Sequence, residues 1–74
     1  MHIVGSKFFL LGKAIEVKRD IIDRMGMYSP TLDCDTQYVI YSDPLNHDQK
    51  SLLNRAKKNN IHCLELEEYL NLAD

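Results

Sequence analysis

The sequence predicts a small α/β domain, in which a mostly parallel four-stranded sheet is flanked by about three helices in the order βαββαβα. Short apolar runs alternate along the chain with segments of helical spacing, as expected when helices connect parallel strands. The segments Phe8–Leu11 and Tyr38–Tyr41 are apolar throughout, which is typical of strands covered on both faces. With 74 residues, 45% of them hydrophobic, the chain has material for one core, so we expect a single domain over residues 1–74.

The first strand and first helix are predicted from their spacing. Phe8–Leu11 is an apolar run that ends at Gly12, which favours a buried strand. In Ala14–Met25, apolar residues recur at intervals of three and four while charged residues occupy the other positions, as in an amphipathic helix. Gly26 then stands where a left-handed residue would end that helix.

Two further strands follow the predicted first helix. Met27–Leu32 contains Ser29-Pro30, and because proline cannot donate a hydrogen bond to a neighbouring strand, we expect at most a short edge strand there. Asp33–Asp35 is a polar turn. Thr36–Tyr41 is the densest run of β-branched and aromatic residues in the chain, so it predicts a central strand.

The last third of the chain predicts a helix, a strand and a helix. Leu45–Asn59 resumes helical spacing, with Asn46 and Gln49 in the positions of an N-terminal capping box. Ile61–Leu64 predicts a short strand, and Glu65–Leu72 a closing helix. We expect that helix to bury three side chains, those of Leu66, Tyr69 and Leu70.

Composition narrows the classes of function. A formal charge of −2 argues against a generally basic nucleic-acid wrapper, and no apolar run approaches the ~20 residues that span a bilayer. Cys34 and Cys63 are 29 positions apart without a Cys-x-x-Cys motif, so we expect free thiols, no zinc site and an intracellular protein. No catalytic constellation or nucleotide-binding loop is present, which predicts a chain without enzymatic activity or cofactor.

The order of short motifs resembles the BRCT domain, an interaction module of DNA-repair proteins and NAD-dependent DNA ligases. Phe9-Leu10-Leu11-Gly12 resembles the first strand and its glycine, and Thr36-Gln37-Tyr38-Val39-Ile40 resembles the third strand. Asn60-Ile61-His62-Cys63-Leu64 and Glu67-Glu68-Tyr69-Leu70 resemble the last strand and closing helix of ligase-type members. Met27 replaces the second glycine of the family's turn, and Tyr69 replaces its usual tryptophan.

The resemblance implies a candidate phosphate-binding site. In BRCT domains that bind phosphate, a hydroxyl residue precedes the first-strand glycine, and a lysine from the second helix completes the pocket. Gly12 and Lys50 occupy the glycine and lysine positions here, whereas Leu11 stands at the hydroxyl position. The missing hydroxyl weakens the expected site, and Ser6 and His47 are the residues that could substitute for it.

Charge is segregated along the chain. Residues 50–64 carry a charge of +4, whereas residues 25–49 and 65–74 each carry −4. The four basic residues form a candidate nucleic-acid-binding set: Lys50, Arg55, Lys57 and Lys58. The simpler interpretation of this set is an ordinary solvated helix face.

Three hypotheses of function follow. The first is a BRCT-like module that binds a protein partner or a second copy of itself, with surplus apolar residues at the interface: Met25, Met27, Tyr28 and Leu32. The second is binding of DNA ends or phosphorylated ligands through Gly12 and Lys50. The third, an α/β carrier or enzyme fragment, is the least favoured because no glycine-rich loop is present. No membrane partner is expected.

Overall fold

The computed structural model describes residues 2–72 and shows a four-stranded sheet. The strands are β1 (Lys7–Gly12), β2 (Met27–Ser29), β3 (Tyr38–Ser42) and β4 (His62–Glu65). They lie in the order β2-β1-β3-β4, and all three neighbouring pairs are parallel. The predicted fold class and order of elements are confirmed.

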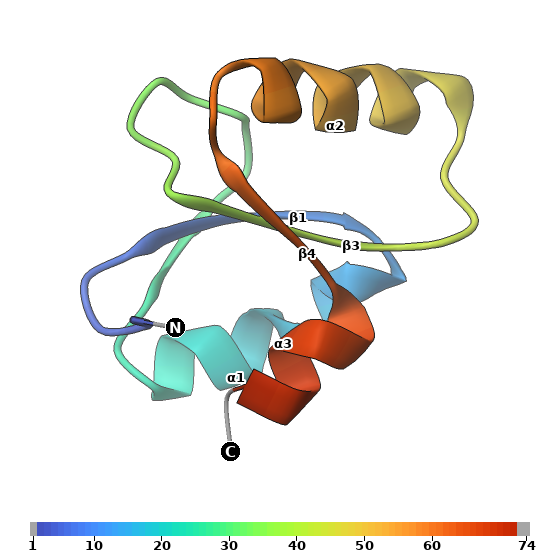
Figure 1. Cartoon of the computed structure of the whole chain (residues 1–74). Helices are drawn as coiled ribbons and strands as arrows, with labels where there is room; N and C mark the ends of the chain where they lie inside the picture. The colour runs from blue at the N-terminus through green and yellow to red at the C-terminus, as the bar shows by residue number, and fades with distance from the viewer. Residues whose placement is uncertain (1, 73–74) are drawn as a thin grey trace.

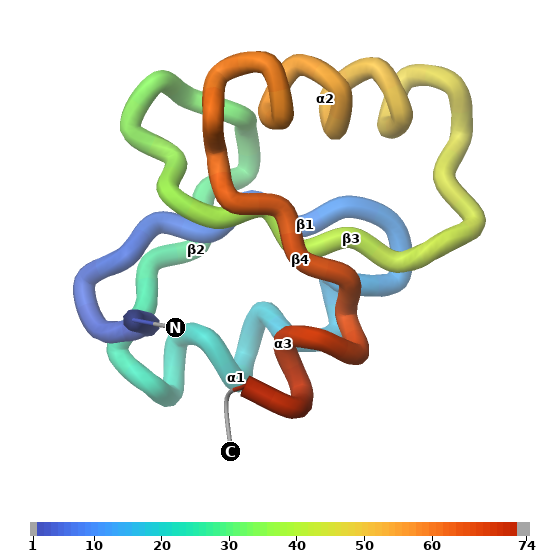
Figure 2. Tube along the Cα trace, in the orientation of Figure 1, coloured from blue at the N-terminus to red at the C-terminus, as the bar shows by residue number. Residues whose placement is uncertain are grey.

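Helices cover both faces of this sheet (Figures 1 and 2). On one face lie a 3₁₀ helix, η1 (Lys13–Val17), and two short α-helices, α1 (Lys18–Asp23) and α3 (Leu66–Leu72). The other face is covered by α2 (His47–Lys58), a helix of 12 residues. We refer to these as the α1–α3 side and the α2 side.

Each side of the sheet has its own hydrophobic core, because successive strand residues point to opposite faces. In β1, Phe8 and Leu10 pack with Ile21 and Tyr69 on the α1–α3 side. Their neighbours Phe9 and Leu11 belong to the core beneath α2. Burial on both faces explains why the central strands are continuously apolar.

The first helical segment differs from the prediction. Instead of one helix over Ala14–Met25, the chain forms η1 and then α1, which ends at Asp23. The left-handed residue is Met25, with φ 69°, and not Gly26. Gly26 is required for space, since a Cβ there would lie 2.7 Å from the Ile21 Cγ2 atom.

The other boundaries follow the prediction with small shifts. Thr36 and Gln37 precede β3 rather than belonging to it, and β2 stops at Ser29, directly before Pro30. The α2 helix begins at His47 with the predicted capping box: the Gln49 amide donates to Asn46 Oδ1 at 2.8 Å, and the Asn46 amide donates to Gln49 Oε1 at 2.9 Å.

The closing helix is attached to α1 by a tyrosine. Tyr69 is fully buried, as predicted, and its hydroxyl donates to Asp20 Oδ2 at 2.6 Å. Burial and the neighbouring carboxylate raise the pKa of Tyr69, so the hydroxyl stays protonated. Leu66 is partly buried against the same core, whereas Leu70 is 49% exposed, so the expectation of a buried Leu70 is wrong.

Candidate functional site

Gly12, the predicted phosphate-binding glycine, lies where β1 ends. It adopts φ 65° and is paired with Ser42 of β3. A Cβ at this position would lie 2.5 Å from the Ser42 carbonyl oxygen and 3.1 Å from Leu45 Cδ2. Two strands and the segment leading into α2 therefore approach too closely here for any side chain, which is a structural reason for glycine.

The start of α2 also lies at the edge of the sheet where the strands end. It carries Lys50, the other residue predicted to bind phosphate. Lys50 is exposed in the first turns of α2, and within residues 2–72 its ammonium group has neither an ion pair nor a hydrogen-bond partner. Leu45, which follows β3 and contacts the Gly12 position, brings this helix start to the end of β1. Gly12 and the N-terminal turns of α2 are thus at one edge of the sheet.

The residues proposed to replace the missing hydroxyl have different positions. Leu11 is 4% exposed and packs in the core beneath α2. Ser6 precedes β1, at the end opposite Gly12, and its hydroxyl donates to the His2 carbonyl oxygen at 2.6 Å, so it cannot serve this site. His47 is exposed in the first turn of α2, at the same edge as Gly12.

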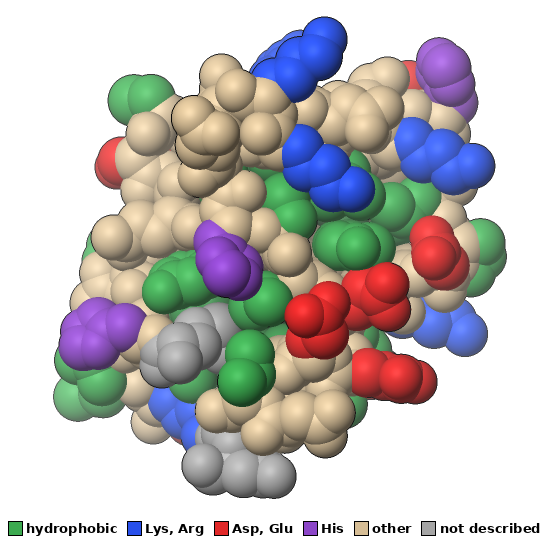
Figure 3. Space-filling view, in the orientation of Figure 1, with side chains coloured by type: hydrophobic (Ala, Val, Ile, Leu, Met, Phe, Trp, Pro, Cys, Tyr) green, Lys and Arg blue, Asp and Glu red, His purple; other side chains and the backbone are tan. Residues whose placement is uncertain are grey.

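Next to this edge is a pocket of about 270 Å³ with an acidic lining. Asp43, Glu65 and Glu67 contribute carboxylates to it, and Tyr41 forms part of its wall. Figure 3 shows acidic side chains clustered where β3 and β4 end. Burial first, and then the charges of Glu65, Glu68 and Asp43, raise the pKa of Tyr41, and a pocket lined by carboxylates disfavours an anion. No group of three or more metal-binding side chains occurs in residues 2–72.

The predicted nucleic-acid-binding residues of α2 do not form one stripe. Lys50 and Lys57 are seven residues apart and share one flank of the helix, where the Lys57 ammonium lies 6.0 Å from the centre of the Tyr41 ring. Arg55 is on the opposite flank and lines a different pocket. Lys58 is exposed between them, so the basic residues are spread around the outer face of the helix (Figure 3).

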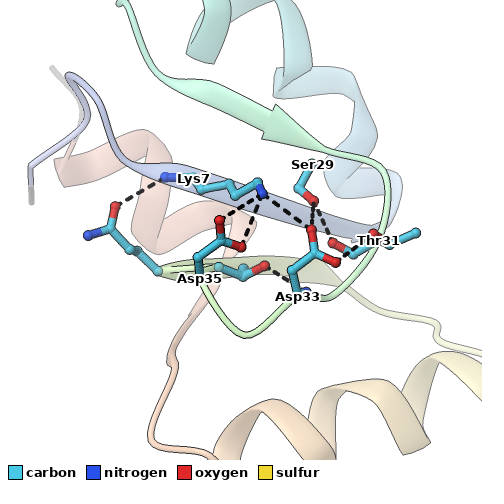
Figure 4. Close-up of polar contacts among 7 residues, drawn as sticks. Lys7, Ser29, Thr31, Asp33 and Asp35 are labelled. Carbon is cyan, nitrogen blue, oxygen red and sulfur yellow. Dashed lines mark hydrogen bonds and ion pairs between the residues drawn. The ribbon is translucent and has the colours of Figure 1, made fainter.

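The segment between β2 and β3 is held by a polar network that the sequence did not reveal (Figure 4). Lys7 Nζ lies 3.3 Å from Asp33 Oδ2 and 3.1 Å from Asp35 Oδ1. Ser29 and Thr31 also donate hydroxyl hydrogen bonds to Asp33, at 3.2 and 3.0 Å. These donors, Thr31 and Lys7 foremost, hold the pKa of Asp33 below its usual value, whereas the carboxylates raise the pKa of Lys7. The network ties the loop to β1 and β2 and gives both carboxylate oxygens of Asp33 a hydrogen-bond donor.

Within residues 2–72, seven large hydrophobic residues are exposed, and they lie in η1, α1, α3, the edge strand β2 and the turns beside β2. None lies between residues 28 and 69, the part of the chain that includes α2. Four of them lie in β2, in the turns beside it or in the preceding helix α1, and we name them the β2-edge patch: Val4, Ile22, Met25 and Met27. Backbone hydrogen bonds join the patch, since Gly5 donates to the Met25 carbonyl and Met25 donates to the Ile22 carbonyl. Of the interface residues suggested by the sequence, Met25 and Met27 are exposed, whereas Tyr28 and Leu32 are half-buried.

Both cysteines are free thiols, as predicted. Cys34 is exposed in the loop between β2 and β3, and Cys63 is half-buried in β4. Burial raises the pKa of the Cys63 thiol, which makes it a weak nucleophile.

In the part of the chain that the structure describes, no helix is both long and apolar enough to cross a membrane.

Comparison with known proteins gives no match: no family model, no curated protein and no solved structure is significantly similar to the chain.

Proposed function

We propose that this chain is a non-catalytic interaction module of the BRCT type, which acts through protein–protein association in DNA repair or replication. The motif resemblance supplies this biological setting, and the βαββαβα order with a four-stranded parallel sheet is the fold that the resemblance implies. The partner is another protein or a second copy of the chain.

The observation that carries the proposal is the β2-edge patch. Met25 is 72% exposed, Val4 61% and Met27 53%, although the domain is small and buries fourteen other hydrophobic residues of the described chain in its core. Single exposed apolar residues are ordinary, but a group of them around one strand edge is typical of a surface that a partner covers. Burial of such a patch stabilises a complex by roughly 25 cal/mol per Å² before the costs of association.

A photo-crosslinking experiment tests this proposal. A photoreactive amino acid replaces Met27 in the patch or, as the control, Ser51, which is exposed on α2. The protein is irradiated in the cells from which it comes. We expect covalent protein adducts from position 27 and few from position 51. Their absence at both positions, or equal adducts at both, would contradict the proposal.

The alternative function is binding of DNA ends or phosphorylated ligands at Gly12 and Lys50. One observation supports this alternative, because the end of β1 meets the start of α2. Another opposes it, because an acidic pocket beside the same edge would repel a phosphate. The alternative predicts that Lys50→Ala weakens binding to a 5′-phosphorylated duplex several-fold more than binding to the unphosphorylated duplex, as measured by fluorescence anisotropy. Lys58→Ala is the matched control. Equal weakening of both duplexes would leave only nonspecific attraction to the DNA backbone.

A further inference from the structure

A second pocket lies on the opposite edge of the molecule from the acidic one. It has a volume of about 310 Å³, which is within the range of small-ligand sites. Its walls come from the loop after β2, from the last turns of α2 and from the residue before β4. The lining residues are Leu32, Asp33, Cys34, Arg55, Asn59 and Ile61. We name it the loop–α2 pocket.

Arg55 gives this pocket an unused positive charge. Within residues 2–72, its guanidinium has no ion pair and no hydrogen-bond acceptor, unlike Arg19 and Arg24, which pair with aspartates of α1. Asn59 follows four residues later on the same flank, and its side-chain amide likewise has no partner in the described chain. A planar fork of N–H donors beside an amide donor is an arrangement that suits a carboxylate.

The carboxylate in the pocket wall does not use these donors. Asp33 Oδ2 accepts hydrogen bonds from Lys7 and Ser29, and Oδ1 accepts one from Thr31. The Lys7 ammonium, which lies 3.3 Å from Asp33 and 3.1 Å from Asp35, is the ion-pair partner of Asp33, so Arg55 remains available in the described chain.

The remaining walls are apolar. Leu32 and Ile61 are half-buried and pack against the core beneath α2, so their exposed parts form a fixed hydrophobic surface. A ligand that places an aliphatic group against them removes apolar area from water, while its charged group reaches Arg55.

We propose that the loop–α2 pocket binds a carboxylate carried on a small aliphatic group, with Arg55 pairing with the carboxylate, Asn59 donating to it, and Leu32 and Ile61 contacting the aliphatic part. A peptide that ends in an aliphatic residue and a free aliphatic acid share this chemistry. The site is separate from the β2-edge patch, so it does not depend on the proposed function.

NMR titration of the ¹⁵N-labelled protein tests the site. The probes are N-acetyl-leucine, its uncharged amide, and an acetylated Ala-Ala-Leu peptide with a free carboxyl terminus. We expect saturable shifts of the amide signals of Cys34, Arg55, Asn59 and Ile61 with both acids, and at least tenfold weaker binding of the amide. Tighter binding of the peptide than of N-acetyl-leucine identifies a chain terminus as the source, and equal binding identifies a free acid.

Two variants separate pairing in the pocket from general attraction to α2. Arg55→Gln removes the pairing group, and Lys58→Gln removes the same charge from an exposed position three residues later, outside the pocket lining. We expect about tenfold or greater loss of affinity for N-acetyl-leucine from Arg55→Gln and less than about twofold from Lys58→Gln. Equal losses, equal binding of inorganic phosphate and N-acetyl-leucine, or no saturable shift would each overturn the proposal.

Discussion

The two sides of the sheet hold their helices by different means. The α2 helix has 12 residues, a capping box at its start and basic residues in its last turn, all of which stabilise a helix locally. The α1 helix has six residues and no side-chain cap, and α3 has seven residues. Helices this short are unstable alone, so α1 and α3 depend on packing and on the contact between Tyr69 and Asp20.

This difference extends to the outer surfaces. The α2 side exposes charged and polar groups, and its helix places Leu53 and Ala56 in the core. The α1–α3 side exposes apolar residues, although its short helices would be less stable in isolation than α2. Apolar exposure on the side that needs tertiary support is consistent with a partner that contacts this side, which is the basis of the proposed function.

The largest expected effect comes from removal of the central side chain of the α1–α3 side. Tyr69→Ala removes a fully buried aromatic ring that packs edge-on against Phe8 at a centroid distance of 6.4 Å. We expect it to lower the free energy of unfolding by about 3–5 kcal/mol, as measured by urea denaturation. Leu53→Ala, the counterpart on the α2 side, is expected to cost about 2–3 kcal/mol because Leu53 retains 8% exposure and the local helix signals persist. A greater loss from Leu53→Ala would reverse the comparison.

The same difference explains how much of the fold could be predicted from the sequence. The cap of α2 was predicted correctly because Asn46 and Gln49 interact within one turn. The division of the first helical segment into η1 and α1 was not predicted. The spacing over Ala14–Met25 fits one continuous helix, whereas in the structure α1 ends at Asp23. Local signals predict local structure, and tertiary contacts decide the rest.

The candidate sites show this limit more strongly. The resemblance to BRCT motifs assigned Gly12 and Lys50 to one phosphate pocket, and the structure does bring the end of β1 and the start of α2 together. The sequence comparison could not show that Asp43 and Glu65, 22 positions apart, would line an acidic pocket beside Gly12 and the start of α2. Nor could it show that Arg55 would face the loop containing Leu32, because this proximity depends on the order of strands in the sheet.

A smaller effect is expected from removal of the tyrosine hydroxyl alone. The hydrogen bond from Tyr69 is the main cause that lowers the pKa of Asp20, followed by contacts with Arg24. Because Asp20 is 43% exposed in its side chain, solvent screens the bond, and we expect Tyr69→Phe to cost about 1 kcal/mol at pH 7.

The pH dependence of this effect has a definite sign. The pKa of Asp20 is lower in the folded protein than in the unfolded chain, so its stabilisation is present above about pH 4 and is lost as pH falls through the folded-state value. The difference between wild type and Tyr69→Phe, measured by urea denaturation at a series of pH values, should therefore shrink below pH 4. A difference that stays constant down to pH 2 would show that the hydroxyl contributes through packing and not through the carboxylate.

The smallest of these effects tests the local stabilisation of α2. Asn46→Ala removes the acceptor for the Gln49 amide and breaks the capping box, so we expect a loss of about 1 kcal/mol in unfolding free energy. Asn54→Ala, an exposed substitution in the middle of the same helix, should be neutral or slightly stabilising because alanine favours helix. Hydrogen exchange of the amides in the first turn of α2 should accelerate in Asn46→Ala, while the amides of α1 remain unchanged. If α1 loosened equally, the helices on the two sides of the sheet would be energetically coupled, and the contrast between local and tertiary stabilisation would not hold.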